Sequence, residues 1–170
     1  MRVLFANMPF SSVRPAMGAS LLKGHLDRMG VESRIEYFNM HFGELAGGQL
    51  NWYISELALS QMMAGEYVFA PHVFPRLAGC EEAYAAMLDE RFAGMVGERG
   101  LARIQHARTL AGPFLDQCLD AVDWTAWDMV GFTTTFNQNM ASLALAVVGP
   151  ADDEAPFAAL LDRAAEAAAA

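Results

Sequence analysis

Two segments of the chain share one pattern, in which a short apolar run is followed by a polar loop and then by a helix-patterned stretch. The first covers residues 1–26 and the second residues 128–146. The pattern is typical of strand-loop-helix units in a parallel sheet that is covered by helices. Such proteins bind ligands at the carboxyl ends of their strands, where both polar loops would lie. The sequence therefore predicts an α/β fold with a ligand site at these two loops.

Three strands are predicted, at residues 3–8, 33–39 and 129–133. Between the first two, residues 19–29 place Leu21, Leu22, His25, Leu26 and Met29 at helical spacing, which predicts a helix with an apolar face. A right-handed crossover then places the second strand beside the first, and a strand order of 2-1-3 opens a crevice between strands one and three. After the third strand, a helix is expected to begin near Asn137, capped by an Asn or Thr side chain, with Met140, Leu143, Ala144 and Val147 on one face.

The expected fold is a flavodoxin-like, Rossmann-like parallel sheet that is incomplete at the C-terminus, because no further strand can be identified after residue 146. Residues 1–148 are expected to form one α/β domain, and residues 149–170 an acidic, Ala-rich tail. Residues 40–125 are too many for a minimal crossover and predict a long helical insertion. Within it, residues 67–74 are predicted to be irregular and broken at Pro71, and Gly112 with Pro113 to break a helix or start a new one.

Charge and composition exclude several functions. The formal net charge of −9 repels phosphate backbones and anionic membrane surfaces, so neither nucleic acid nor a membrane is expected as a partner. No apolar stretch is long enough to span a bilayer, and no secretory signal can be identified, which predicts a soluble, cytoplasmic protein. The two cysteines, Cys80 and Cys118, match no metal or redox spacing and are expected to be buried, reduced thiols.

The candidate site is a set of mostly neutral hydrogen-bonding residues with one cation. It comprises Asn7, Ser11, Ser12, Arg14 and Gly18 after the first strand, and Thr133, Thr134, Thr135, Asn137 and Gln138 after the third. These groups suit a large polar ligand with amide, hydroxyl or phosphate groups better than they suit hydrolysis. Alternatively, they only cap helices and fill turns. No catalytic or metal-ligating residue is predicted, and the single Gly18 does not make a dinucleotide-binding G-x-G-x-x-G loop.

Residues 3–26 and 130–145 resemble the N-terminal cobalamin-binding domain of radical S-adenosylmethionine enzymes. The combination of Asn-Met-Pro-Phe-Ser-Ser-Val-Arg-Pro at residues 7–15, Val-Phe-Ala-Pro at 68–71 and Gly-Phe-Thr-Thr-Thr-Phe at 131–136 is more specific. It is similar to the amino-terminal part of a subfamily that matures ribosomally synthesised peptides. The resemblance implies that the two loops contact cobalamin. Asn39-Met40-His41 departs from the D-x-H-x-x-G motif, so no histidine ligand to cobalt is expected.

Members of that family continue into further strands and a barrel whose Cys-x3-Cys-x2-Cys motif holds an iron-sulfur cluster and binds S-adenosylmethionine. With two distant cysteines, this chain is not expected to be catalytic alone. Three interpretations stay open. The chain is a cobalamin-binding-type module whose cofactor binding is weak or lost; it is one subunit of a split radical enzyme, whose partner supplies the cluster; or it is a truncated product without activity. A precursor peptide or a barrel subunit is the expected partner. The open edge of the third strand is expected to self-associate, to aggregate, or to be covered by residues 157–161 of the tail.

Overall fold

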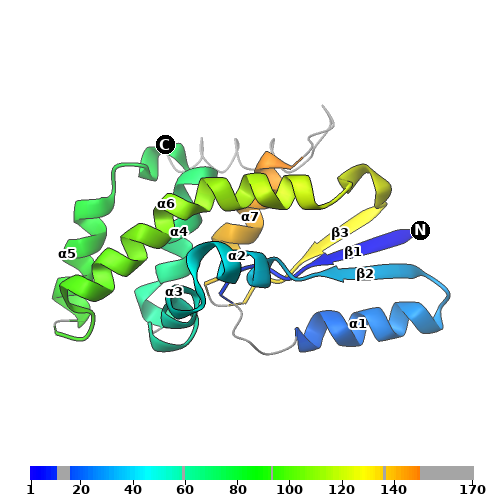
Figure 1. The fold of residues 1–170 in the computed structure, drawn as a ribbon, viewed down its shortest axis with the longest axis horizontal. Coiled ribbons are helices and arrows are strands. Elements are labelled where there is room, and N and C mark those ends of the chain that lie inside the picture. The colour runs from blue at the N-terminus through cyan, green and yellow to red at the C-terminus, as the bar shows by residue number, and fades with distance from the viewer. Residues whose placement is uncertain (11–15, 59, 93, 136, 150–170) are drawn as a thin grey trace, which may run out of the picture.

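The computed structural model describes residues 1–10, 16–58, 60–92, 94–135 and 137–149. It is an α/β structure with a three-stranded parallel sheet in the order β2-β1-β3. The predicted strand order and the parallel pairing are confirmed. Figure 1 shows α1 against one face of the sheet, with most of the other helices beyond the carboxyl ends of the strands. This arrangement leaves the strand ends at the junction between the sheet and the helices.

The strands are β1 (Arg2–Ala6), β2 (Glu32–Glu36) and β3 (Met129–Phe132). Central β1 has a nearly continuous apolar sequence because both of its faces are covered. The prediction that the second strand extends to residue 39 is wrong, because a helix begins directly after it at Phe38. The backbone N–H of Asn39 donates to the carbonyl of Asn7 at 3.0 Å, which turns the chain away from the sheet.

The first helix, α1 (Met17–Arg28), is present, but its apolar side is not packed as predicted. Leu21, Leu22 and Met29 are exposed, with 70% of Leu21 accessible, and Ala19 is the buried residue of the helix. Helical spacing is a local property, whereas burial requires an opposing surface. Among the described residues, α1 contacts mainly β2 and leaves its outer side uncovered.

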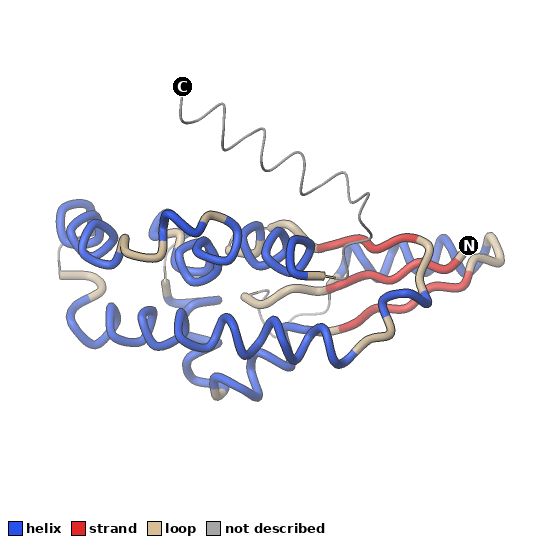
Figure 2. Tube along the Cα trace, turned by 90° about the horizontal axis from the view of Figure 1, so that it is seen from above, coloured by secondary structure: helices blue, strands red, loops and turns tan. Residues whose placement is uncertain are grey.

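The long connection between β2 and β3 is largely helical. Figure 2 shows these helices gathered at one end of the molecule and the three strands at the other. In chain order it contains α2 (Phe38–Ala46), α3 (Gly48–Trp52), the π-helical turn η1 (Tyr53–Leu57), η2 (Ser60–Met62), α4 (Ala64–Val73), η3 (Pro75–Leu77), α5 (Glu81–Phe92), α6 (Gly97–Ala121) and η4 (Trp124–Ala126). The predicted break at Gly112 and Pro113 is wrong, because α6 is continuous through both residues.

Residues 67–74, predicted to be irregular, belong mostly to helix α4, which contains Pro71. Pro71 has no N–H to donate to the carbonyl of Tyr67, one turn earlier. That carbonyl instead accepts a hydrogen bond from Nη1 of Arg108 at 2.9 Å. A side chain from α6 thus replaces the missing backbone donor, and a tertiary contact allows a helix where the local sequence argues against one.

The core lies between the sheet and the helical connection. Phe10, Phe42, Phe69 and Phe114 pack with ring centroids 5.0 to 6.1 Å apart, in tilted and edge-to-face arrangements. All four rings are buried. Aromatic pairs in such geometry stabilise the fold beyond the area they bury. Phe10, in the loop after β1, therefore connects the carboxyl end of the sheet to the helices.

The last described helix is α7 (Asn139–Val148). The group that caps its first turn and the residues that it buries both differ from the prediction. Its N-cap residue, Gln138, makes no side-chain cap, and the Glu66 carboxylate of α4 instead accepts the N–H groups of Asn139 and Met140. The buried residues of α7 are Ala141, Ser142, Ala144 and Leu145. Small residues face α4, so the two helices approach closely.

Candidate functional site

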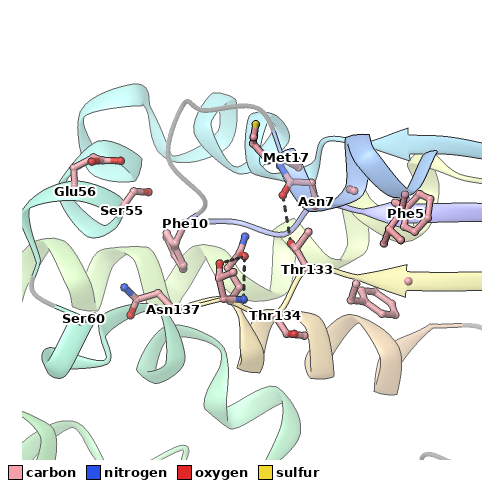
Figure 3. A pocket seen from close by; sticks show the side chains of 18 of the residues that line it. Phe5, Asn7, Phe10, Met17, Ser55, Glu56, Ser60, Thr133, Thr134 and Asn137 are labelled. Carbon is pink, nitrogen blue, oxygen red and sulfur yellow. Dashed lines mark hydrogen bonds between the residues drawn. The ribbon is translucent and has the colours of Figure 1, made fainter. Parts of the chain in front are cut away.

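A cavity of about 880 Å³ lies at the carboxyl ends of β1 and β3, where the sequence predicts the ligand site. Figure 3 shows its lining side chains, which come from both loops, from α1 and from the helical connection. Of the predicted residues, Asn7, Gly18, Thr133, Thr134, Thr135, Asn137 and Gln138 line it. Ser11, Ser12 and Arg14 lie outside the described residues. The topology has thus brought two loops more than a hundred positions apart in the chain to one cavity.

Asn7 is a positioning residue at the floor of this cavity. Its Nδ2 donates to Oδ1 of Asn39 at 2.9 Å, and its Oδ1 accepts from the hydroxyl of Thr133 at 3.3 Å. The same hydroxyl accepts from the backbone N–H of Met8 at 3.0 Å. Buried polar groups of this kind are held by hydrogen bonds because an unpaired one is costly. Together they fix the end of β1 against α2 and the end of β3 (Figure 3).

Gln138 holds the second loop in a similar way. Its Nε2 donates to the carbonyl of Met8 at 2.6 Å, and its Oε1 accepts from the hydroxyl of Thr135 at 2.5 Å. The side chain is almost wholly buried. For Gln138, these contacts support the alternative prediction, in which the polar residues of the two loops stabilise turns and do not contact a ligand. Thr134 differs, because it is exposed in the cavity and forms no hydrogen bond with the described residues.

Both loops contain a residue in the left-handed backbone region. Phe10 has a φ of 65° and Asn137 a φ of 67°. Asn tolerates this conformation, whereas a phenylalanine adopts it only when packing compensates for the strain. Phe10 is held by the rings of Phe42 and Phe69, and Oδ1 of Asn137 accepts the backbone N–H of Gly65 at 3.1 Å. Both left-handed residues at the edge of the cavity are therefore held by tertiary contacts.

The polar lining residues that were not predicted are Ser55, Glu56 and Ser60 of the helical connection. They follow no strand and match no motif, so no local signal identifies them. Glu56 is the one charged group among the described residues that line the cavity. Apolar walls are supplied by residues such as Phe5, Met17 and Leu22. The cavity combines flat apolar surface with neutral hydroxyls and a single carboxylate.

The described lining residues combine hydroxyl groups with the carboxylate of Glu56 and include no His, Cys or Lys. The strongly shifted groups lie elsewhere. Burial raises the pKa of the Cys118 thiol on α6, and burial also raises the pKa of the Tyr84 hydroxyl on α5. Within the described ranges, no group of three or more His, Cys, Asp or Glu residues could hold a metal ion.

The chain matches no known family model, and no curated protein or solved structure is significantly similar to it. No helix in the described part of the chain is long and apolar enough to cross a membrane. The candidate site is therefore interpreted from its own geometry and chemistry.

Proposed function

We propose that the chain is a cobalamin-binding-type module, flavodoxin-like in topology, of a radical S-adenosylmethionine enzyme that modifies ribosomally made peptides. The observation that carries the proposal is the cavity between the ends of β1 and β3. Its two loops are the segments whose sequences resemble the cobalamin-binding domain. The helical connection between β2 and β3, predicted at residues 40–125, is in this proposal an insertion into that domain.

The chemistry of the lining fits a corrin. A corrin is a flat macrocycle with primary amides around its edge, and these amides both donate and accept hydrogen bonds. The cavity offers Phe5, Phe10 and Leu22 as apolar surface, and the hydroxyls of Thr134 and Ser60 as hydrogen-bonding groups. Its volume of about 880 Å³ is at the upper end of the range for small-molecule sites.

No histidine is among the described residues of the lining, so the proposal assigns no protein ligand to cobalt. His41 lies on α2, with its Nε2 3.6 Å from a carboxylate oxygen of Glu36, and does not line the cavity. The cofactor, when bound, would supply the radical chemistry, and this chain would bind and orient it. We also propose a cytoplasmic location, since both cysteines are free thiols.

An absorbance titration with hydroxocobalamin, confirmed by equilibrium dialysis, tests the proposal. We expect saturable binding that Thr134→Val weakens by about 1–3 kcal/mol, the cost of leaving a ligand amide unpaired. Thr109→Val is the matched control, because Thr109 is exposed on α6 and lies outside the cavity. Absence of binding at millimolar cofactor, or equal effects of the two substitutions, would overturn the proposal.

The exposed side of α1 favours a second candidate, a subunit of a split radical enzyme whose partner supplies the cluster. Leu21 on α1 is 70% exposed, and Met29, the residue directly after this helix, is 63% exposed. A partner surface would remove them from water. Co-expression with a barrel subunit bearing the Cys-x3-Cys-x2-Cys motif should give a stable complex that Leu21→Glu disrupts. Survival of the complex with that substitution would exclude this surface.

A further inference from the structure

Strand β3 forms one edge of the sheet (Figure 1), and no described strand pairs with its outer side. The backbone N–H of Thr133 donates to the carbonyl of Ala6 in β1 at 3.0 Å. Successive residues of a strand direct their backbone groups to opposite sides, so Phe132 and Val130, one and three positions earlier, direct theirs to the outer edge. The edge therefore offers the N–H and C=O groups of two residues to a further strand.

This edge is complementary to itself under a two-fold axis. If β3 of a second copy runs antiparallel, with Gly131 facing Gly131, then Val130 of each copy lies opposite Phe132 of the other. Both members of each pair point to the shared edge, so each pair exchanges two hydrogen bonds. Sliding the second copy by two residues would instead place Phe132 opposite Asp128, whose N–H already donates to the carbonyl of Arg2. The opposite shift moves part of the pairing beyond the end of the strand, so the register centred on Gly131 pairs the outer groups best.

The charges beside the strand also favour the antiparallel arrangement. The strand itself contains no charged residue, and Asp128, directly before it, is the nearest one in the sequence. In the register centred on Gly131, Asp128 lies opposite the uncharged Thr134 of the second copy. Parallel pairing in register would instead place the two Asp128 carboxylates side by side, and like charges in that position are destabilising.

The same register brings Met129 of the second copy to the large cavity. Val130 and Phe132 pack against the core, so Met129, Gly131 and Thr133 face the other side of the sheet. Gly131 and Thr133 line the cavity. With Gly131 facing Gly131, Met129 of the second copy lies directly opposite Thr133. Its side chain, which is 55% exposed in the single chain, would be covered there and would add an apolar wall to the cavity.

We propose that two copies of the chain pair antiparallel through β3, centred on Gly131, and that Met129 of each copy lines the cavity of the other. The two sheets then form one sheet in the order β2-β1-β3-β3-β1-β2. The pairing itself needs no ligand, whereas a contribution of Met129 to ligand binding rests on the proposed function. The shared edge is short and each copy carries a net charge of −9, so we expect a weak dimer that salt strengthens.

Disulfide trapping in the full chain tests the register, because it captures a weak dimer. In a Cys80→Ser background, Gly131→Cys places the thiols of two copies opposite each other, at the Cα separation of about 4.5–5.5 Å that a disulfide accepts. With glutathione disulfide as the oxidant, we expect a cross-linked species of twice the 18.5 kDa chain mass. Met129→Cys is the matched control in the same strand. Its two thiols lie about 13 Å apart along the strands in this register and should not cross-link.

A mixture of Met129→Cys and Thr133→Cys chains provides a second test that leaves Gly131 intact, and it should give a mixed cross-linked dimer. Absence of cross-linking in this mixture, absence of cross-linking in Gly131→Cys that is folded by circular dichroism, or equal cross-linking of Met129→Cys with itself would each overturn the pairing. Trapping uses no cobalamin. Cross-linking without hydroxocobalamin binding would therefore overturn the proposed function alone, and cofactor binding without cross-linking would overturn the pairing alone.

Discussion

The carboxylate of Glu66 on α4 accepts hydrogen bonds from Asn139 at the start of α7, from its backbone nitrogen at 3.3 Å and from its Nδ2 at 3.0 Å. A second oxygen accepts from the N–H of Met140 at 2.7 Å. The first N–H groups of a helix need such partners, and a negative charge there is favoured by the helix dipole. A residue 73 positions earlier thus caps the helix that follows the cavity loop.

Glu66→Ala should lower the free energy of unfolding by about 2 kcal/mol, because it removes charge-assisted hydrogen bonds and leaves N–H groups of α7 unpaired. Urea denaturation followed by circular dichroism measures the change. Glu90→Ala removes an exposed carboxylate from α5 and serves as the control, with an expected change below about 0.5 kcal/mol. Equal stability of the two variants would show that the Glu66 cap contributes little.

Gly65 and Gly24 should respond to alanine in opposite directions. A Cβ at Gly65 would lie 2.3 Å from the carbonyl oxygen of Asn137, so the backbone of the cavity loop would have to move. Gly65→Ala should therefore destabilise the protein by about 1–3 kcal/mol. A Cβ added at Gly24, inside α1, would meet no atom within 4 Å, and Gly24→Ala should stabilise the protein by about 0.5–1 kcal/mol.

Thermal unfolding of the two glycine variants against the wild type measures both shifts. A Gly65→Ala variant as stable as the wild type would contradict the packing of α4 against the loop after β3. A destabilised Gly24→Ala variant would contradict the open surroundings of Gly24 in α1. The crystal structure of Gly65→Ala should in addition show Asn137 displaced.

The two cysteines should differ in reactivity. Cys118 is fully buried on α6, and burial raises the pKa of its thiol well above the usual range, so the reactive thiolate is not populated near neutral pH. Cys80 is only half-buried. At pH 8 an aromatic disulfide reagent should modify one thiol of the native protein rapidly and the second only in urea. Rapid reaction of both thiols in the native protein would contradict the burial of Cys118.

Strand β3 should be a site of self-association. It pairs with β1, and its other edge has no partner strand among the described residues. Met129 at its start is 55% exposed, and an uncharged edge of this kind pairs readily with a second copy. Size-exclusion chromatography with light scattering should show a species larger than 18.5 kDa, or hydrogen exchange should show poor protection of Val130 and Phe132.

Met129→Lys places a charge on this edge and should restore a monomer, whereas Met95→Lys changes a similarly exposed methionine outside the sheet and should not. A wild-type monomer with β3 fully protected from exchange would mean that another part of the chain covers the edge.

The sequence by itself determined the sheet and the polar residues of the cavity at the strand ends. The apolar runs that form β1 and β3 are local signals, and a strand order of 2-1-3 follows from the βαβ connection and the polar strand ends. Because parallel strands end at one side of a sheet, Asn7, Thr133 and Gln138 had to meet there. Their neutral, polar character could therefore be assigned to a site before any contact was known.

Tertiary structure decided the features that depend on partners distant in the chain. Pro71 lies inside a helix because Arg108 donates the hydrogen bond that Pro71 cannot donate to the carbonyl of Tyr67. Asn39 lies in a helix and not in the second strand, and its side chain accepts a hydrogen bond from Asn7. The apolar spacing of α1 predicted a buried face that no described element covers. Ser55 and Glu56 line the cavity only because the helical connection folds back over the strand ends. The spacing of apolar residues predicts which residues lie on one face of a helix. Whether that face is buried depends on the other elements that pack against it.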